Sequence, residues 1–299
     1  MRIAALVCTR NRGAIVLSAV RSILDNDYSD FEVIVVDQST DDHAENALAV
    51  LRGDARFRYI RSPTAGLSNA RNLGISHATS PVVAMTDDDC IVPQSWLSRI
   101  DSVFRNDPQV AILLGSVIPA QHDKSKGFVV GYTRPTAVIA KNIRDKHHIE
   151  GMAACMAIRT EAWAALSGFD PMLGVGASLQ SADETDMIIR CLLAGYHVYE
   201  TPDIAVIHNG LRAWSDADSV VHGYLFGIGA TFAKHLKCGH WSIAHVGAAL
   251  AGRWLFAGPV VDYGFKPSRR IRMLGFLRGF RTGMSMPVDR RTSQFVHTS

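Results

Sequence analysis

The sequence has little excess charge and few cysteines, and both shortages exclude classes of protein. Its 31 Lys and Arg residues nearly balance its 28 Asp and Glu residues, which leaves a formal net charge of +3. A nucleic-acid-binding domain carries a larger basic excess, so we expect no nucleic-acid partner. The five cysteines are an odd number without a Cys-x-x-Cys pair, which fits neither a disulfide framework nor a cysteine zinc site. A reducing cytosol suits such cysteines best.

Long apolar runs are also scarce. The run at residues 3–7 is too short for a signal peptide, and polar residues follow it. The nearest candidate for a membrane span, residues 241–261, is interrupted by His245, Arg253 and Pro259. A bilayer span needs roughly 20 apolar residues with few charges. We therefore predict an amphipathic helix at 241–261 and a cytoplasmic location.

The remaining composition, 47% hydrophobic and 20% charged, is typical of a globular protein that can bury a core. The first third alternates apolar, β-branched runs with stretches of helical spacing. Strands are predicted at 3–8, 32–37, 57–60, 81–86 and 110–118, and helices at 14–24, 42–51, 67–77 and 95–104. This alternation predicts an α/β fold of parallel βαβ units, in which ligands bind at the carboxyl ends of the strands.

The later part of the chain is less regular. We interpret residues 121–148 as a variable insertion and predict a strand at 151–159, a helix at 181–194 and two short strands within 196–208. From about 215 to 284 the pattern predicts helices. We therefore divide the chain into a domain at 1–215, with halves 1–118 and 119–215, and a C-terminal helical extension at 216–299.

Three adjacent carboxylates, Asp87, Asp88 and Asp89, follow a predicted apolar strand. Their mutual repulsion would be relieved by a divalent cation, and oxygen ligands suit Mg²⁺ or Mn²⁺. Such a cation could also hold a diphosphate. The alternative is an acidic turn that helps to start the helix at Ser95. His208, at the end of a later strand, is either a further metal ligand or a structural histidine.

Polar residues also follow the first two predicted strands. A dinucleotide-binding fold would place Gly-x-Gly-x-x-Gly after strand one, and its absence disfavours a dehydrogenase. Asp37, at the end of strand two, can accept the ring N–H of uracil or thymine, or it can cap the next helix. The residues after strand one could hold a base and ribose, or form a solvated loop; they are Thr9, Arg10, Asn11 and Arg12.

A second acidic group, Asp183, Glu184 and Asp186, opens a predicted helix. Ser181 and Glu184 have the spacing of a capping box, which is the structural interpretation. In the functional interpretation Glu184 or Asp183 is a general base, because two close carboxylates raise the pKa of one of them. Arg190 lies further along the same helix, where it could orient an acid or contact phosphate.

The C-terminal helices carry arginines interleaved with large apolar residues. A basic amphipathic helix of this kind can lie on an anionic bilayer, which would place the protein at the inner face of the cell membrane. The alternative is a helix packed on the domain with a solvated basic face. The arginines are Arg269, Arg270, Arg272, Arg278 and Arg281.

Taken in order, these segments resemble a family 2 glycosyltransferase of the GT-A fold. The resemblance covers about residues 3–240. It rests on the Thr-Arg-Asn-Arg start, the base-binding second strand, the Arg-Asn-x-Gly helix, the Asp-x-Asp motif, the acceptor-side loop, the acidic-pair helix and the late histidine. These correspond here to residues 8–12, 36–41, 66–74, 87–89, 168–176, 183–196 and His208.

The resemblance implies a mixed, mainly parallel sheet flanked by helices, with a nucleotide-sugar-binding half at 1–118 and an acceptor-binding half at 119–215. It implies a metal-dependent, inverting transfer of sugar from a nucleoside-diphosphate donor, with UDP or dTDP favoured. The acceptor would be a hydroxyl of a glycan, a lipid-linked glycan or a small molecule, in cell-surface polysaccharide or glycolipid synthesis. It also implies Mn²⁺ or Mg²⁺ bound by Asp87, Asp89 and His208. The nucleotide contacts it implies are Thr9, Arg10, Asn11, Arg12, Asp37, Asn69, Arg71, Asp87 and Asp88.

One departure concerns the acidic pair. The family usually has Glu-Asp with the base in second place, whereas this sequence has Asp183-Glu184. The order favours Glu184 as the base, with its carboxylate displaced by about one methylene, and leaves Asp183 as the alternative. Asp186 and Arg190 belong to the same motif. Two other functions stay open: a non-catalytic nucleotide-sugar binder of the same fold, and a membrane-surface scaffold.

Overall fold

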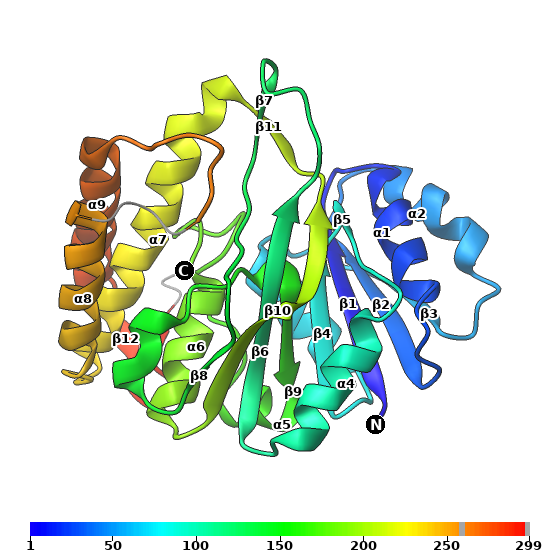
Figure 1. Cartoon of the computed structure of the whole chain (residues 1–299), viewed down its shortest axis with the longest axis horizontal. Coiled ribbons are helices and arrows are strands. Elements are labelled where there is room, and N and C mark those ends of the chain that lie inside the picture. Colours follow the sequence, from blue (N-terminus) through cyan, green and yellow to red (C-terminus); the bar gives the residue numbers. More distant parts are fainter. Residues whose placement is uncertain (257–260, 297–299) are drawn as a thin grey trace.

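The computed structural model describes residues 1–256 and 261–296. Within these residues, nine strands form one sheet that runs through the middle of the molecule (Figure 1). The sheet order is β3 (Phe57–Arg61), β2 (Phe31–Asp37), β1 (Ile3–Thr9), β4 (Val82–Asp87), β9 (Met156–Arg159), β6 (Val110–Pro119), β10 (His197–His208) and β5 (Cys90–Ile91), and β8 (Val138–Ala140) pairs with β10.

The sheet is mixed and mainly parallel, as the sequence predicts. Strands β1 to β4 are parallel neighbours, and β10 is parallel to β6. The short β9 lies antiparallel between β4 and β6. Every residue of β2 is buried, because helices cover both faces of the sheet, and this is why residues 33–36 form a continuous apolar run.

Two cores lie on the two faces of the sheet. Successive residues of β1 point into opposite cores. Ile3, Ala5 and Val7 face one core, and Ala4 and Leu6 face the other. Helices α1 (Ile15–Leu24) and α4 (Trp96–Asn106) contribute to the first core, and α3 (Leu67–His77) and α6 (Asp183–Leu193) to the second. The shorter helices α2 (His43–Leu48) and α5 (Thr160–Ala165) complete the expected βα alternation.

Three helices, α7 (Ala217–Lys237), α8 (Ile243–Phe256) and α9 (Arg269–Ser285), form a layer at the left of Figure 1, beside α6. Helices α7 and α9 touch backbone to backbone through glycines. A Cβ atom added at Gly279 would lie 1.9 Å from the carbonyl oxygen of Phe226, and one at Gly229 would lie 2.1 Å from that of Phe276. This close contact fixes which face of α9 turns inward.

The C-terminal extension is helical, but less continuously than predicted. The predicted helix at 241–261 begins at Ile243 and ends at Phe256; residues 257–260 lie outside the described part, and 261–268 are not helical. No helix in the described ranges combines the length and apolar character that crossing a bilayer requires.

Two other predictions of secondary structure are wrong in detail. The two strands expected within 196–208 are one strand, β10, whose pairing with β6 is irregular between Glu200 and Ala205. The strand expected at 151–159 is reduced to β9, after a 3₁₀ turn at Ala153–Cys155.

The expected insertion contains short elements. Its strand β7 (Gly127–Val129) pairs with β11 (Leu211–Ala213), and it also contains β8 and a 3₁₀ helix at Ile143–His148. Near the C-terminus, β12 (Val288–Asp289) pairs with β13 (Gln294–Phe295).

Candidate functional site

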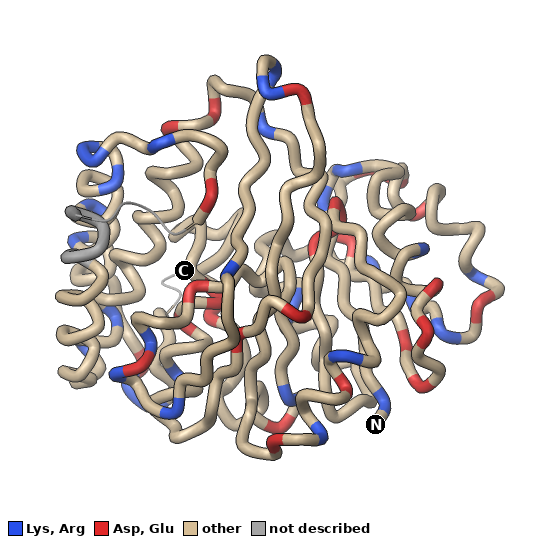
Figure 2. The backbone as a smooth tube through the Cα atoms, in the orientation of Figure 1, with Lys and Arg blue, Asp and Glu red and all other residues tan. Residues whose placement is uncertain are grey.

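The parallel strands bring the predicted site residues to one edge of the sheet. In the register of β1 with its neighbours, Thr9 lies opposite Asp37, and Cys8 lies opposite Asp87. The ends of β1, β2 and β4 therefore meet, as expected for the ligand-binding edge of an α/β sheet. Lys and Arg (blue) and Asp and Glu (red) are both present around this edge in Figure 2.

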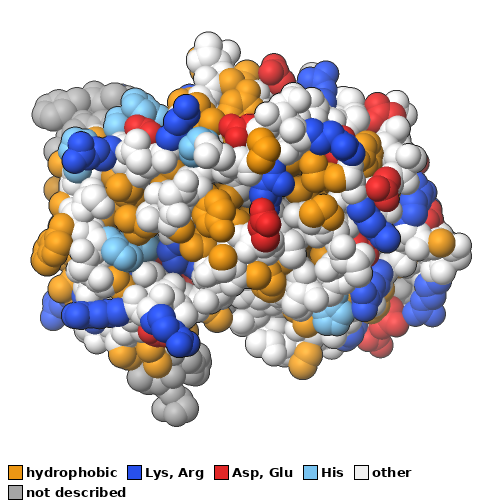
Figure 3. Space-filling model, turned by 90° about the horizontal axis from the view of Figure 1, so that it is seen from below, with side chains coloured by type: hydrophobic (Ala, Val, Ile, Leu, Met, Phe, Trp, Pro, Cys, Tyr) orange, Lys and Arg blue, Asp and Glu red, His pale blue; other side chains and the backbone are white. Residues whose placement is uncertain are grey.

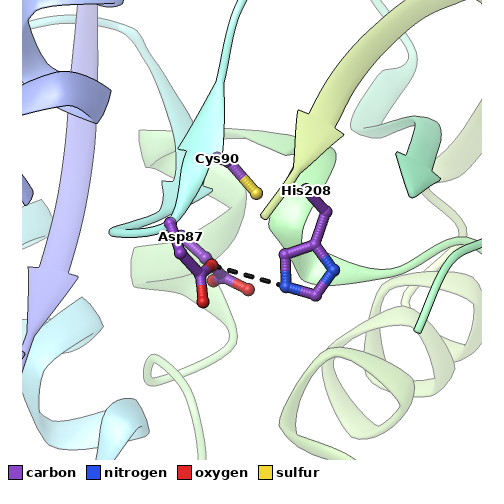
Figure 4. A group of neighbouring side chains, drawn as sticks. Asp87, Cys90 and His208 are labelled. Atoms are coloured by element: carbon purple, nitrogen blue, oxygen red, sulfur yellow. Dashed lines mark ion pairs between the residues drawn. The ribbon is translucent and has the colours of Figure 1, made fainter. Parts of the chain in front are cut away.

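A cluster of four side chains at this edge could hold a metal ion. The ligand atoms of Asp87, Asp89, Cys90 and His208 all lie within 4.8 Å of one another. Asp87 comes from the end of β4, and His208 comes from the end of β10, which pairs with β5 at Cys90 (Figure 4). The sequence predicted Asp87, Asp89 and His208 for this role, whereas the proximity of Cys90 was not predicted.

The orientation of His208 suits a metal ligand. Its Nδ1 lies 2.7 Å from the carbonyl oxygen of Val130, so this nitrogen carries the proton and donates it. The other ring nitrogen, Nε2, lies 3.4 Å from Oδ1 of Asp89. A backbone carbonyl behind one ring nitrogen is the usual arrangement that fixes a histidine toward a metal.

The donor set fits Mn²⁺ or Mg²⁺. Two carboxylates and one imidazole are hard or borderline ligands that these ions accept. Burial raises the pKa of the Cys90 thiol, which disfavours its thiolate form while no cation is bound. Burial also opposes ionisation of Asp89, but its interactions with His208 and Arg12 outweigh this effect and hold its pKa below the usual value. Asp89 is thus ionised, as a ligand must be.

The acidic turn does not start α4. The strand β5 separates Asp89 from that helix, and among the described residues the side chain of Ser95 makes no capping hydrogen bond. The middle acid, Asp88, accepts a hydrogen bond of 2.6 Å from the Thr9 hydroxyl. Burial raises the pKa of Asp88 to about 6. Arg12 contacts Asp89 and lies 3.6 Å from Asp88. Its guanidinium group therefore neutralises part of the negative charge of the three aspartates.

Among the predicted nucleotide residues of the first loop, Asn11 holds the loop in its conformation. The backbone N–H of Asn11 donates to the hydroxyl of Ser39 at 2.8 Å, and the Asn11 side chain accepts from the N–H of Thr40 at 2.8 Å. Asn11 has a φ of 54°, a left-handed conformation that asparagine tolerates. Arg10 is exposed beside this loop. On α3, Asn69 donates to the carbonyl oxygen of Ala65 at 2.8 Å.

Asp37 is enclosed rather than open. Its two oxygens accept hydrogen bonds from the N–H of Ser39 and the hydroxyl of Tyr59, each at 2.7 Å, and Arg61 lies 3.6 Å away. Its exposed fraction is 0%. It does not cap α2, whose first turn follows Asp42. Asp37 therefore anchors the β2–β3 edge, and its contact with a base stays a prediction.

Arg71 joins the two acidic groups. Its guanidinium is buried, contacts Asp183 and lies 3.8 Å from Asp87. The resemblance placed Arg71 near the nucleotide, and the structure places it between the end of β4 and the start of α6. The candidate metal cluster and the candidate base are thus parts of one site.

The capping box predicted at the start of α6 is absent. Ala182 precedes the helix with a φ of 69°, and within the described chain no side chain caps it. The Ser181 hydroxyl instead donates to the carbonyl oxygens of Gly223 and Tyr224 on α7, each at 3.0 Å. Glu184 is therefore not occupied by capping.

The three acids of α6 have different surroundings. Burial, followed by the charge of Asp183, raises the pKa of Glu184 to about 8. Asp183 faces Arg71. Asp186 is fully buried, and although burial opposes its ionisation, Arg190, Lys234 and His235 hold its pKa far below the usual range. Only Glu184 combines a raised pKa with a place on the wall of a cavity, whose volume is about 100 Å³.

Asp186 and Arg190 form a buried network that the sequence did not indicate. Arg190 lies 2.9 Å from Asp186 and donates to the carbonyl oxygens of Leu166 and Gly168. Lys234 lies 2.7 Å from both Asp170 and Asp186. The acid that Arg190 contacts is Asp186. The sequence signal that could have revealed this network is a lysine and a histidine inside the apolar run that forms α7.

Comparison with known proteins agrees with this geometry. The model of glycosyl transferase family 2 matches residues 4–163, which is more than half of the chain. The glycosyltransferase GlyG of Streptococcus pneumoniae is 31% identical over 37% of this chain and 38% of its own length. A glucosyl-dolichyl phosphate glucuronosyltransferase of Haloferax volcanii is 26% identical over 40% of this chain and 39% of its own length. The matches cover from 13% to 43% of the curated relatives.

Solved structures share the fold over nearly the whole chain. The mannosyltransferase PcManGT of Pyrobaculum calidifontis, in complex with GDP-Man and Mn²⁺, has a TM-score of 0.60 at 18% identity and covers 97% of this chain and 84% of its own. S. aureus TarS in complex with UDP-GlcNAc has a TM-score of 0.58 at 16% identity and covers 98% and 93%. The GT-A fold expected from the sequence is confirmed, and the chain belongs to glycosyl transferase family 2.

Proposed function

We propose that the chain is a metal-dependent, inverting glycosyltransferase that moves a sugar from a nucleoside-diphosphate donor to a hydroxyl acceptor. The observation that carries this proposal is the link made by Arg71. It joins the cluster of Asp87, Asp89 and His208 to the start of α6, where Glu184 has a pKa of about 8. A metal and diphosphate site thus lies beside a candidate base.

In the proposed reaction, Glu184 removes the proton from the acceptor hydroxyl. The oxygen forms a bond to the anomeric carbon while the bond from that carbon to the diphosphate breaks, and the nucleoside diphosphate leaves with the electron pair. Attack from the side opposite the diphosphate inverts the anomeric centre. A base works best when its pKa is near the working pH, and the surroundings of Glu184 supply this.

The other site residues bind and orient. Asp87, Asp89 and His208 would hold Mn²⁺ or Mg²⁺, and the ion supplies positive charge against the diphosphate. Arg71 holds Asp183 in place beside the base. The loop of Thr9–Arg12 and Asp37 would bind the nucleotide, and a carboxylate there favours the ring N–H of UDP or dTDP. We place the reaction in cell-surface polysaccharide or glycolipid synthesis, with a glycan, lipid-linked or small-molecule acceptor.

Calorimetric titration with UDP, dTDP, GDP and ADP, with and without Mn²⁺, tests the donor site. We expect one nucleotide to bind at least about tenfold more tightly with Mn²⁺, and Asp89→Asn to abolish that gain. The matched control is Asp123→Asn, an exposed acid that hydrogen-bonds Ser125 in a surface loop. Equal binding with and without metal, or an unchanged Asp89→Asn protein, would contradict the proposal.

We also propose that the outward face of α9 contacts an anionic membrane. Large apolar residues are exposed there, including Met273 at 51% and Leu277 at 57%. Arginines lie between them, and neither α8 nor α9 contains an acidic residue. Figure 2 shows this end carrying blue segments, and hydrophobic and basic side chains lie together at the left of Figure 3. This pattern is typical of a helix at a bilayer surface, and it favours a lipid-linked acceptor.

Sedimentation with vesicles tests this contact. We expect binding to vesicles that contain phosphatidylglycerol and little binding to pure phosphatidylcholine, because arginines favour anionic headgroups. Leu277→Asp should weaken binding by about tenfold, since burial of a leucine contributes about 1.5 kcal/mol or more. Val50→Asp, at a similarly exposed residue far along the chain, is the control. Equal binding by both variants would refute the assignment to α9.

A further inference from the structure

One arginine of α9 differs from the others. The sequence groups Arg272 with the basic face of the helix, but the structure buries it to an exposed fraction of 5%, while Arg269, Arg270, Arg278 and Arg281 are exposed. It lies one turn before Gly275, on the face that packs against α7. The expectation of a solvated arginine is therefore wrong at this position.

The guanidinium of Arg272 is short of partners. Its Nε and Nη1 atoms are buried and make no hydrogen bond to any residue that the structure describes. A buried cation without a counter-charge is strongly unfavourable, so a protein that keeps one needs a group that satisfies it. That group must be an acceptor of hydrogen bonds, and an anion satisfies a guanidinium best.

The place of Arg272 shows where that group would lie. Arg272 and Glu184 line the same cavity, together with Tyr224 and Tyr263. Much of the remaining wall is apolar, formed by residues such as Ile188 and Phe232, and a wall of low polarity strengthens interactions between charges. The other charged residues that line the cavity, Lys146 and Glu150, already have partners within the protein. Lys146 donates a hydrogen bond to the carbonyl oxygen of Ile149 at 2.8 Å, and Glu150 also interacts with another group.

We propose that this cavity is the acceptor's anion subsite, in which Arg272 binds an oxyanion of the acceptor and so places its hydroxyl at Glu184. The inference rests on the proposed function, because it takes Glu184 as the base. The chemistry shared by the candidate ligands is a phosphate or carboxylate group close to the accepting hydroxyl. A phosphate would come from a phosphorylated or lipid-phosphate-linked sugar, and a carboxylate from an acidic sugar. The C-terminal extension then contributes directly to acceptor choice.

The test uses the full chain, saturated with Mn²⁺ and the nucleotide that binds, so that the donor site is filled. Methyl phosphate, methyl glucuronide and uncharged methyl glucoside are then titrated in separate experiments. We expect an anion to bind and methyl glucoside not to bind. Arg272→Met should weaken anion binding by about tenfold or more, because it removes charge-assisted hydrogen bonds. The control is Arg105→Met, an exposed arginine on α4 that pairs with Asp101.

The outcomes separate the two anions and the two proposals. Preference for methyl phosphate indicates a phosphorylated acceptor, and preference for methyl glucuronide an acidic sugar. Equal anion affinity in the Arg272→Met and Arg105→Met proteins would overturn the subsite, as would a wild-type protein that binds no anion and leaves the cavity to water. If no nucleotide binds at all, the proposed function itself fails. Arg272→Lys keeps the charge and should give an intermediate affinity, which keeps the test valid if Arg272→Met does not fold.

Discussion

The acidic groups at the end of β4 and at the start of α6 have similar compositions but opposite surroundings. Asp87 at the end of β4 is 38% exposed, whereas Asp186 in α6 has an exposed fraction of 0%. In the first group, the carboxylate oxygens of Asp87 and Asp89 lie close to a ring nitrogen of His208, at the end of β4. The second divides its acids between separate partners, with Arg71 at Asp183 and a buried cation network at Asp186.

This difference shows that the neighbours, more than the acids, determine what each carboxylate can do. Gathered and partly exposed carboxylates can share one cation from solution. A carboxylate enclosed by Arg190 and Lys234 already has its cations and is structural. Glu184 has burial and a like charge beside it, so its proton is held near neutral pH. Three acids within four positions of α6 thus have three different surroundings.

The largest expected effect comes from removing Glu184, the proposed base. Glu184→Gln keeps the size of the side chain but cannot accept a proton from the acceptor, so the transfer rate should fall by about 10²- to 10⁴-fold. Nucleotide affinity, measured by the same titration as for the wild type, should be unchanged because the donor cluster is intact.

Asp183→Asn is the matched variant for this experiment. It removes the carboxylate that Arg71 contacts and leaves Glu184 in place. Full transfer in Glu184→Gln, together with a loss of the expected size in Asp183→Asn, would move the role of base to Asp183.

The next effect compares the two acidic groups through stability. Asp186→Asn leaves Arg190 buried without its carboxylate and leaves Lys234 with Asp170 alone, so the free energy of unfolding should fall by about 3–5 kcal/mol. Asp87→Asn lies at a partly exposed position, and a change below about 1 kcal/mol is expected there. Urea unfolding measures both. Equal losses would mean that burial does not separate the two groups as the structure indicates.

Much of the fold followed from local pattern. The helix predicted at 67–77 has the bounds of α3, and the apolar runs before Thr9, Asp37 and Asp87 are strands. Because parallel strands end at one edge, the sequence also predicted that these three residues would be neighbours.

What could not be predicted depended on distant partners. Ser181 and Glu184 have the spacing of a capping box, but carbonyl groups of α7, more than forty residues away, bind the Ser181 hydroxyl. Arg272 and Arg278 look alike in sequence, and the contact of α9 with α7 is what buries the first and exposes the second. Spacing within a helix says which residues share a face, and it does not say what that face meets.

The smallest effect concerns pH, and it sharpens the comparison within α6 itself. The base must be deprotonated, and the pKa of Glu184 is raised to about 8, so the transfer rate should rise about tenfold per pH unit below 8 and level off above it.

Stability changes in the opposite direction, because the fold favours the protonated form of Glu184. The contribution of Glu184 to the free energy of unfolding is present below its usual pKa of 4.5, and it is lost as the pH rises to about 8. Asp186 has a lowered pKa, so its contribution is present above its usual pKa of 3.8 and is lost on acidification below it. Initial rates and urea unfolding across this range measure both. A rate that stays flat between pH 6 and 8 while Glu184→Gln remains inactive would mean that Glu184 is already ionised at pH 6 in the working enzyme, because a base that loses its proton at about 8 cannot give a flat profile there.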